Sequence, residues 1–213
     1  MIEEIVGITL RSLSISGAAT LLASSWSIPV AYKISRSQRL SAFFMPIVEA
    51  IIGMPTVLIG LVMYMLLCSR GPLGVFRLLY TPYAIILGQA ILITPLLIAT
   101  SFRSLFHANQ RYGELALTLG ATERQAMKLV LTESTPGIIA SIVMSFSRAL
   151  GELGVALMVG GNIRGYTRVI TTAIALEVSR GEFELALTLG CILIIILIIV
   201  SLSLRMLRRL QPL

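Results

Sequence analysis

Two residues in this 213-residue chain, Arg148 and Glu152, carry charges that could do chemistry in an apolar environment. They lie four positions apart in a long apolar stretch, a spacing that places both side chains on one face of a helix. An ionised group inside a bilayer costs about 2.5–3.5 kcal/mol on insertion scales, so each needs a partner. We favour a neutralised pair that fixes this helix, although the order cation before anion is the weaker one and packing must help. The alternative is an anion-binding role for Arg148.

The other reactive residue types do not form a recognisable catalytic or metal site. His107 is the only histidine and has no cysteine nearby in sequence, so we interpret it as an interfacial polar residue. Cys68 and Cys191 lack C-x-x-C spacing, and nothing supports a disulfide between them. The sequence contains no aspartate, G-x-S-x-G or H-E-x-x-H, which argues against an intramembrane enzyme. It also lacks the phosphate-binding pattern G-x-x-x-x-G-K-[ST].

The composition places the chain among membrane proteins. Hydrophobic residues make up 56% of it, and the mean hydropathy is +0.93. The length suits one membrane domain, residues 1–213. The net charge of +7 comes from basic residues clustered between apolar stretches, which is typical of membrane topology rather than of nucleic-acid binding. Glu3 and Glu4 stand where a signal peptide needs positive charge, so we expect the first span to be retained.

The apolar stretches predict an all-α polytopic membrane protein of about five spans. A bilayer core of about 30 Å needs about 20 apolar helical residues. Five stretches meet this requirement: 9–34, 42–67, 82–105, 136–159 and 183–204. A sixth, 169–179, is too short to span and predicts a re-entrant or interfacial helix. Glu49 lies in the second span between Pro46 and Pro55, which predicts a kink that faces either a pathway or other helices.

The distribution of basic residues predicts the orientation of these spans. With five spans, one side holds Lys33, Arg36, Arg39, Arg103, Arg111, Arg124, Lys128, Arg205, Arg208 and Arg209. The other side holds Arg70, Arg77, Arg164, Arg168 and Arg180, together with Glu3 and Glu4. The more basic side is expected to be cytoplasmic, so the N-terminus lies outside and the C-terminus inside a cell (plasma or inner) membrane.

Residues 112–131, YGELALTLGATERQAMKLVL, form a charged amphipathic segment on the cytoplasmic side. Gly120 can take a positive φ and end a first helix. Thr122 can cap the next helix, with Gln125 as its capping-box partner. This second helix is expected over 123–131, with an apolar stripe of Met127, Val130 and Leu131. The pattern fits either a projecting element gripped by a soluble partner or an amphipathic loop lying on the membrane surface.

This segment resembles the EAA signature of the permeases of ATP-binding-cassette (ABC) importers, Glu-Ala-Ala followed by three residues and Gly. The chain has Glu114-Leu115-Ala116, three residues and then Gly120. The later Ile-x-Leu-Pro of the family is matched poorly, because Thr132 and Glu133 replace Leu-Pro. The resemblance implies docking into a cytoplasmic ATPase through Glu114, Ala116, Gly120, Ala121 and Thr122. The heptapeptide ELALTLG recurs at 184–190, which we interpret as convergent composition rather than a duplicated domain.

Further motifs resemble molybdate and tungstate permeases. They are Gly53-Met54-Pro55-Thr56-Val57, Gly71-Pro72-Leu73-Gly74, Arg148-Ala149-Leu150-Gly151-Glu152-Leu153-Gly154 and Gly160-Gly161-Asn162-Ile163. The continuation over 165–187 is most similar to the tungstate-type permease. Molybdate and sulfate permeases of the same type are alternatives. An ATP-independent channel or a membrane scaffold is a less well supported alternative, because neither would need a segment that contacts an ATPase.

The resemblance also implies a set of partners around a type I importer-like fold. Two copies of the chain would pair in the lipid membrane above two ATPase subunits, which would bind ATP and Mg²⁺, with no cofactor in this chain. An extracytoplasmic binding protein would deliver the oxyanion. The loop 160–168, with Asn162, Arg164 and Arg168, would face this receptor and give an anion a favourable field. The alternative is an ordinary solvated loop.

Overall fold

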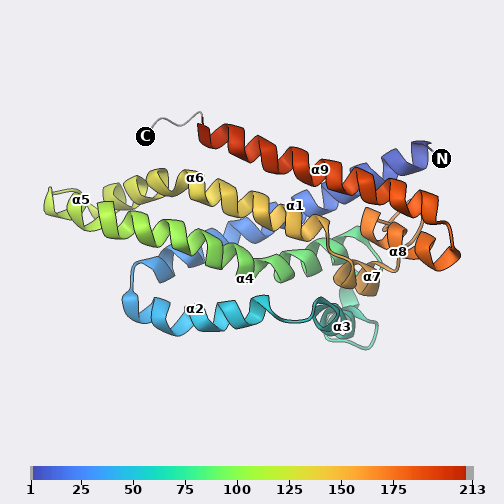
Figure 1. Cartoon of the computed structure of the whole chain (residues 1–213). Helices are drawn as coiled ribbons and strands as arrows, with labels where there is room; N and C mark the ends of the chain where they lie inside the picture. Colours follow the sequence, from blue (N-terminus) through green and yellow to red (C-terminus); the bar gives the residue numbers. More distant parts are fainter. Residues whose placement is uncertain (1, 210–213) are drawn as a thin grey trace.

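The computed structural model describes residues 2–209, with side chains described for residues 2–203. Over these residues the chain is helical, with no strand (Figure 1). The α-helices are α1 (Ile2–Ser35), α2 (Gln38–Ile52), α3 (Thr56–Leu67), α4 (Pro82–Ala108), α5 (Glu114–Thr118), α6 (Glu123–Leu150), α7 (Gly154–Gly160), α8 (Ile170–Arg180) and α9 (Phe183–Arg209). A 3-10 turn, η1 (Gly74–Phe76), precedes α4, and a π-helical turn, η2 (Asn109–Gly113), joins α4 to α5.

Four stretches are long and apolar enough to cross a bilayer: Ile2–Ser35, Pro82–Thr118, Glu123–Leu150 and Phe183–Ser203. The pair α2 and α3 makes a fifth if it is counted as one broken span. This confirms the predicted class, an all-α polytopic membrane protein of about five spans.

The second predicted span, 42–67, is broken rather than straight. Its two halves, α2 and α3, meet at an angle of 93°. Pro55 lies at the break and precedes the first residue of α3. It has no N–H to continue the hydrogen bonds of α2, and it disfavours the helical conformation in the residue before it. Pro46 lies inside α2, so the sharp bend occurs at Pro55 and not at Pro46.

The fourth predicted span, 136–159, begins too late. In the structure α6 is a single helix from Glu123 onward, so the predicted short helix 123–131 is only its first part. Pro136 lies inside α6 without ending it. Membrane helices tolerate such a proline because neighbouring groups can satisfy the carbonyl that it leaves free. The charged segment that begins at Glu123 and the span are therefore one continuous element.

The same predicted span also ends too late, because α6 ends at Leu150, with Gly151 as its C-cap. The side chain of Glu152 then accepts a hydrogen bond from the backbone N–H of Val155 at 3.3 Å. This bond satisfies one of the N–H groups that the start of α7 leaves without a helical partner. The last part of the predicted span is therefore the separate helix α7.

The centre of the bundle is formed by α1, α4 and α6. Fully buried alanines meet where these helices cross: Ala19 and Ala23 of α1, Ala90 of α4 and Ala149 of α6. Small side chains let helix backbones approach closely, which drives helix association where lipid supplies no hydrophobic force.

Gln89 of α4 adds hydrogen bonds to this contact. Its side chain accepts a bond from Oγ of Ser16 at 3.2 Å and donates one from Nε2 to the carbonyl of Ala149 at 3.0 Å. The residue is only 1% exposed. One amide therefore links α4 to α1 on one side and to α6 on the other.

The loops gather at two ends of the bundle, as the span count predicts (Figure 1). The α1–α2 connection and α5 lie at one end, here called the α5 end, and the N-terminus, α3, α7 and α8 lie at the other, the α8 end. At the α5 end, Arg36 and Glu123 are 3.2 Å apart. The side chains of Arg205, Arg208 and Arg209, which the orientation argument also uses, lie outside the described residues.

The short apolar stretch 169–179 forms α8, an 11-residue helix. It packs mainly on α9 and also touches α1, where the N–H of Ile170 donates to Oγ of Ser12 at 2.8 Å. Its length is too short to cross a bilayer. Its position relative to the bilayer, re-entrant or interfacial, stays a prediction.

The crossing of α4 and α7 yields a stability prediction. A Cβ added at Gly88 would overlap the side chain of Val155, which is fully buried and stiff about χ1. We expect Gly88→Ala to lower the free energy of unfolding by about 1–3 kcal/mol, seen as a lower Tm of the purified permease. Gly17→Ala is the matched control, since nothing lies within 4 Å of its added Cβ. Equal Tm values for the two variants would contradict this packing.

Candidate functional site

The segment between α4 and α6 is a tight, fully hydrogen-bonded turn. Gly120 takes φ +87°, and the N–H of Ala121 donates to the carbonyl of Ala116 at 3.0 Å. Thr122 then caps α6: its Oγ1 accepts from the N–H of Gln125 at 3.4 Å, and Oε1 of Gln125 accepts from the N–H of Thr122 at 2.8 Å. The predicted left-handed glycine and the predicted capping box are both confirmed.

The turn presents apolar side chains to the outside. Leu115, Leu117 and Leu119 are 55%, 45% and 79% exposed, and Glu114 is exposed beside them. Ala116 is buried and packs beneath the turn. An exposed apolar patch on a rigid projection is the kind of surface at which proteins dock, so we take this turn as the candidate site. We call Leu115, Leu117 and Leu119 the leucine tip.

One of the three residues predicted for the apolar stripe on the first part of α6 is wrong: Val130 is buried and Leu131 packs against the same core, but Met127 is exposed. Ala126 and Val130, four residues apart, are buried against the rest of the bundle. Met127 is 39% exposed and points away from this face. The small residue Ala126, rather than the larger Met127, allows the helix to lie close to its neighbours.

Two contacts attach this segment to the end of α1. Arg36 donates to Glu123 at 3.2 Å, and Nδ2 of Asn109 donates to the carbonyl of Ser35 at 3.5 Å. Asn109 begins the π-helical turn η2 between α4 and α5. Such turns are often found at functional sites. The leucine tip is therefore carried by α4 and α6 and steadied by α1.

Arg148 and Glu152 form the ion pair that their spacing allows. Nη1 of Arg148 donates to Oε2 of Glu152 at 2.7 Å. The Glu152 side chain is 3% exposed, whereas that of Arg148 is 43% exposed. Oγ1 of Thr171, in α8, donates to the backbone carbonyl of Glu152 at 2.7 Å. The contact therefore ties the end of α6 to α7 and α8, while part of the guanidinium stays on the surface of the subunit.

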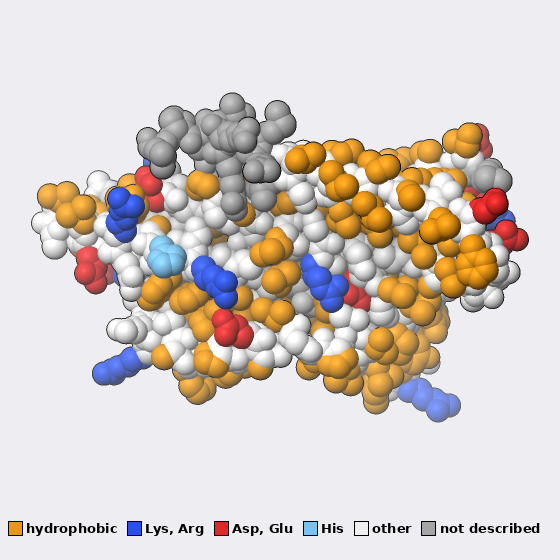
Figure 2. Space-filling view, viewed as in Figure 1, with side chains coloured by type: hydrophobic (Ala, Val, Ile, Leu, Met, Phe, Trp, Pro, Cys, Tyr) orange, Lys and Arg blue, Asp and Glu red, His pale blue; other side chains and the backbone are white. Residues whose placement is uncertain are grey.

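A second pair involves Glu49, whose role the sequence left open. Glu49 of α2 lies 3.9 Å from Arg103 of α4, and both side chains are more than half exposed. Figure 2 shows oppositely charged side chains next to each other within the long body of the molecule as well as at its ends. The bundle therefore has one face that carries charge at the depth of its spanning helices.

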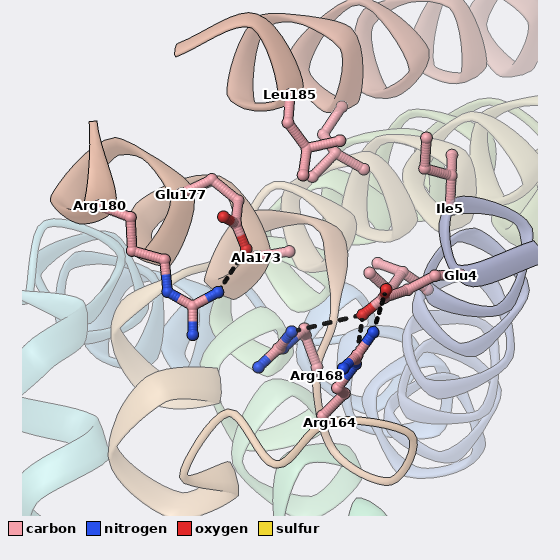
Figure 3. A pocket seen from close by; sticks show the side chains of 10 residues that line it. Glu4, Ile5, Arg164, Arg168, Ala173, Glu177, Arg180 and Leu185 are labelled. Atoms are coloured by element: carbon pink, nitrogen blue, oxygen red, sulfur yellow. Dashed lines mark hydrogen bonds and ion pairs between the residues drawn. The ribbon is translucent and has the colours of Figure 1, made fainter. Parts of the chain in front are cut away.

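The loop 160–168 is fastened to the start of α1 (Figure 3). Nε and Nη2 of Arg164 donate to the carboxylate of Glu4 at 2.8 and 2.6 Å, and Nη1 of Arg168 lies 3.6 Å from the same carboxylate. The hydrogen bonds that Arg164 donates to Glu4 raise the pKa of Arg164. Arg164 is 73% exposed, whereas Arg168 is 10% exposed and lies beneath the loop. Asn162 takes a left-handed φ of 51° in the turn between them and α7.

Sequence reasoning missed two polar residues that hold these parts together. Arg11 of α1 donates to the carbonyls of Arg168 and Gly165 at 2.9 and 3.0 Å. Gln89 links the three central helices, as described above. Both lie inside predicted spans, and a lone charge or amide in an apolar span is the signal that could have revealed them.

A bundle of long apolar helices that carries a rigid, leucine-tipped turn at one end defines a polytopic membrane protein. The chain belongs to the family of binding-protein-dependent transport system inner membrane components, whose profile matches residues 19–211. The fold agrees with that of a chain in the crystal structure of an amino acid ABC transporter with histidines, at a TM-score of 0.63 and 15% identity. That match covers 98% of this chain and 94% of the other. The chain is thus a multi-pass inner-membrane transport subunit and not itself an enzyme.

Among its relatives, two are tungstate uptake system permease proteins named TupB. The one from Peptoclostridium acidaminophilum is 35% identical over 93% of this chain and 87% of its own length. The one from Campylobacter jejuni is 37% identical over 89% of this chain and 83% of its own length. The molybdenum transport system permease protein ModB of Haemophilus influenzae is 29% identical over 94% of this chain and 91% of its own length.

The unequal burial of Arg148 and Glu152 predicts unequal effects of their removal. Arg148→Gln leaves a buried carboxylate without its cation, which should cost about 3–5 kcal/mol. Glu152→Gln leaves an arginine that is already half exposed and should cost clearly less. We expect the Tm of the purified permease to fall most for Arg148→Gln, least for Glu152→Gln, and to recover partly in the double variant. The opposite order would show that the pair does not hold the helices as described.

Proposed function

We propose that this chain is the transmembrane subunit of an ATP-driven importer for tungstate or a closely related oxyanion. The observation that carries this proposal is the identity of more than one third with two tungstate permeases over most of the chain. A molybdenum permease and a sulfate permease are also similar to this chain, but at lower identity. Molybdate, and after it sulfate, are therefore the alternative substrates for the same mechanism. We treat residues 1–213 as a single permease domain with a coupling segment at 112–131.

The leucine tip supports docking of a cytoplasmic ATPase. Its leucines are exposed on a turn whose backbone is fixed by Gly120 and by the Thr122 cap, so a partner meets a preformed surface. Glu114, Gly120 and Thr122 lie on the outside of this turn, while Ala116 and Ala121 hold its shape. In the proposed complex the ATPase subunits bind ATP and Mg²⁺, and this chain binds neither.

The continuity of α6 supports direct mechanical coupling. One helix of 28 residues, about 40 Å long, joins the Thr122 cap to the Arg148–Glu152 pair. When ATP binding closes the ATPases, a shift of the docked tip moves α6 as one body. The pair passes this motion to α7 and α8, and the pathway between two permeases then opens alternately to either side.

The charged face supports a second copy of the chain as partner. Arg148 is 43% exposed at the depth of the spanning helices, and Glu49 and Arg103 are also exposed. Exposure of these groups to lipid would be costly, so this face must meet water or protein. A homodimer with a hydrated pathway between its two charged faces satisfies this requirement.

The remaining partners follow from the two ends of the bundle. We place the α5 end in the cytoplasm, because most of the basic residues are expected on that side of the membrane. The N-terminus then lies outside and the C-terminus inside. The α8 end then faces the extracytoplasmic binding protein, and Asn162 and Arg164 lie on a loop of this end. Arg168 is buried under this loop and shapes it from below rather than meeting the receptor.

The repeated heptapeptide provides a matched test of the coupling segment. Gly120→Glu places a charge beside the leucine tip and strains a backbone held at φ +87°, so the ATPase should no longer co-purify. Gly120→Ala should weaken co-purification less. Gly190→Ala changes the same position of the second ELALTLG, inside α9, and has open space for its Cβ. Retention of the ATPase by Gly120→Glu at wild-type yield would rule out this docking site.

The substrate is tested by ATP hydrolysis in liposomes that contain this permease, its ATPase and its binding protein. We expect receptor-dependent stimulation of ATPase activity by tungstate, with a smaller response to sulfate. Equal stimulation by molybdate would keep the mechanism and broaden the substrate. If a well-assembled complex responds to none of the three anions, the oxyanion assignment is wrong.

A further inference from the structure

A cavity of about 220 Å³ lies at the α8 end, between the first turns of α1, the loop 160–168, α8 and the start of α9 (Figure 3). Its walls carry three guanidinium groups and two carboxylates: Arg164, Arg168, Arg180, Glu4 and Glu177. Its other lining residues are the apolar Ile5, Ile8, Ala173, Leu185 and Leu189. The cavity therefore carries one net positive charge beside an apolar surface.

Both carboxylates already form hydrogen-bonded ion pairs with arginines at the edges of the cavity. Glu4 accepts two hydrogen bonds from Arg164, and Glu177 accepts one from Nη1 of Arg180 at 3.3 Å. Arg168 lies between these pairs in Figure 3, and among the described acidic side chains it reaches only Glu4, at 3.6 Å. The positive charge in excess is thus centred on Arg168.

Arg168 is also the most buried of the three arginines. The residue is 8% exposed, and its Nε has no hydrogen-bond partner among the described residues. The Arg168 side chain lines the cavity, and Glu4 at 3.6 Å is already bonded to Arg164, so the site favours a ligand that brings acceptor oxygens to this guanidinium. Arginine pairs with the oxygens of oxyanions through several N–H groups at once, and this pairing is strengthened where apolar walls exclude water.

We propose that this cavity binds a tetrahedral oxyanion between Arg168 and Arg180. The site lies at the α8 end, away from the charged face proposed for the pathway, and does not depend on the transport function. Two sources share this chemistry. One is a free inorganic dianion, and the other is the phosphate group of an anionic lipid whose tail lies along Ile5 and Leu185.

The first experiment measures anion binding to the full permease with its ATPase, without nucleotide, in nanodiscs of phosphatidylcholine. Equilibrium dialysis against sodium tungstate and sodium sulfate gives the affinity. Arg180→Gln removes one donor and should weaken binding about tenfold. Glu177→Gln removes the competing negative charge and should strengthen it. Arg70→Gln is the control, because Arg70 is an exposed arginine of the same end that does not line the cavity.

The second experiment tests the lipid as source, with phosphatidylglycerol in place of the free anion. Native mass spectrometry counts the phosphatidylglycerol molecules that the wild-type, Arg180→Gln, Glu177→Gln and Arg70→Gln proteins retain. Loss of one molecule in Arg180→Gln only, together with no binding of free tungstate or sulfate, supports the site and identifies the lipid. Binding of the free anions with the predicted order of variants supports the site and identifies the solute.

The proposal is overturned if Arg180→Gln weakens the binding of neither free anion and does not lower the number of phosphatidylglycerol molecules retained. Tungstate that binds equally to all four proteins would sit elsewhere, for example in the pathway, and would also overturn it. Neither measurement uses ATP hydrolysis. A failure of the proposed importer function would therefore appear in the liposome assay alone, and a failure of this site would appear in the binding assays alone.

Discussion

A bilayer interior offers polar side chains no water to bond with, so a partner must come from the protein itself. The described part of the bundle is arranged around this requirement. Gln89 takes its partners from α1 and α6, Glu152 takes its cation from the same helix, and Arg11 takes two carbonyls from a distant loop. These bonds fix which helices lie together and at what height, while the alanines between them set how closely they approach. A substitution that leaves one of these groups unpaired would thus disturb the helix arrangement as a whole.

The same arrangement separates rigid parts from parts that can adjust. The tip at the α5 end, α6 and the junction with α7 and α8 are connected by helical backbone or by hydrogen bonds. By contrast, α2 and α3 meet at a sharp break, and the pair between Glu49 and Arg103 is long and exposed. Relative motion in a transport cycle is therefore expected between the broken pair and the rest, rather than within α6.

The number of spans, the left-handed Gly120 and the Thr122 cap could all be predicted, because each depends on local chemistry that is visible over a few residues. The ends of α6 could not. Proline at position 136 suggests a boundary, but only tertiary packing determines whether a helix passes through it. The two copies of ELALTLG make the same point: the first ends at a left-handed glycine and the second continues as helix through Gly190. For the cavity at the α8 end, Arg164 and Arg168 were visible in the sequence, but their partner Glu4 is about 160 positions away and no local pattern connects them.

The fastening of α1 has a consequence for the biogenesis of the protein. Arg11 and its acceptor at Gly165 are 154 positions apart, and Glu4 and Arg164 are 160 apart. Ribosomes add roughly 5–20 residues per second, so α1 is synthesised on the order of 10–30 s before its partners exist. During that interval the first helix carries a cation and a carboxylate that the finished bundle will pair but the nascent chain cannot. Early insertion therefore has to keep the first three turns of α1 in contact with water or with the insertion machinery until the loop 160–168 has been synthesised and placed beside them.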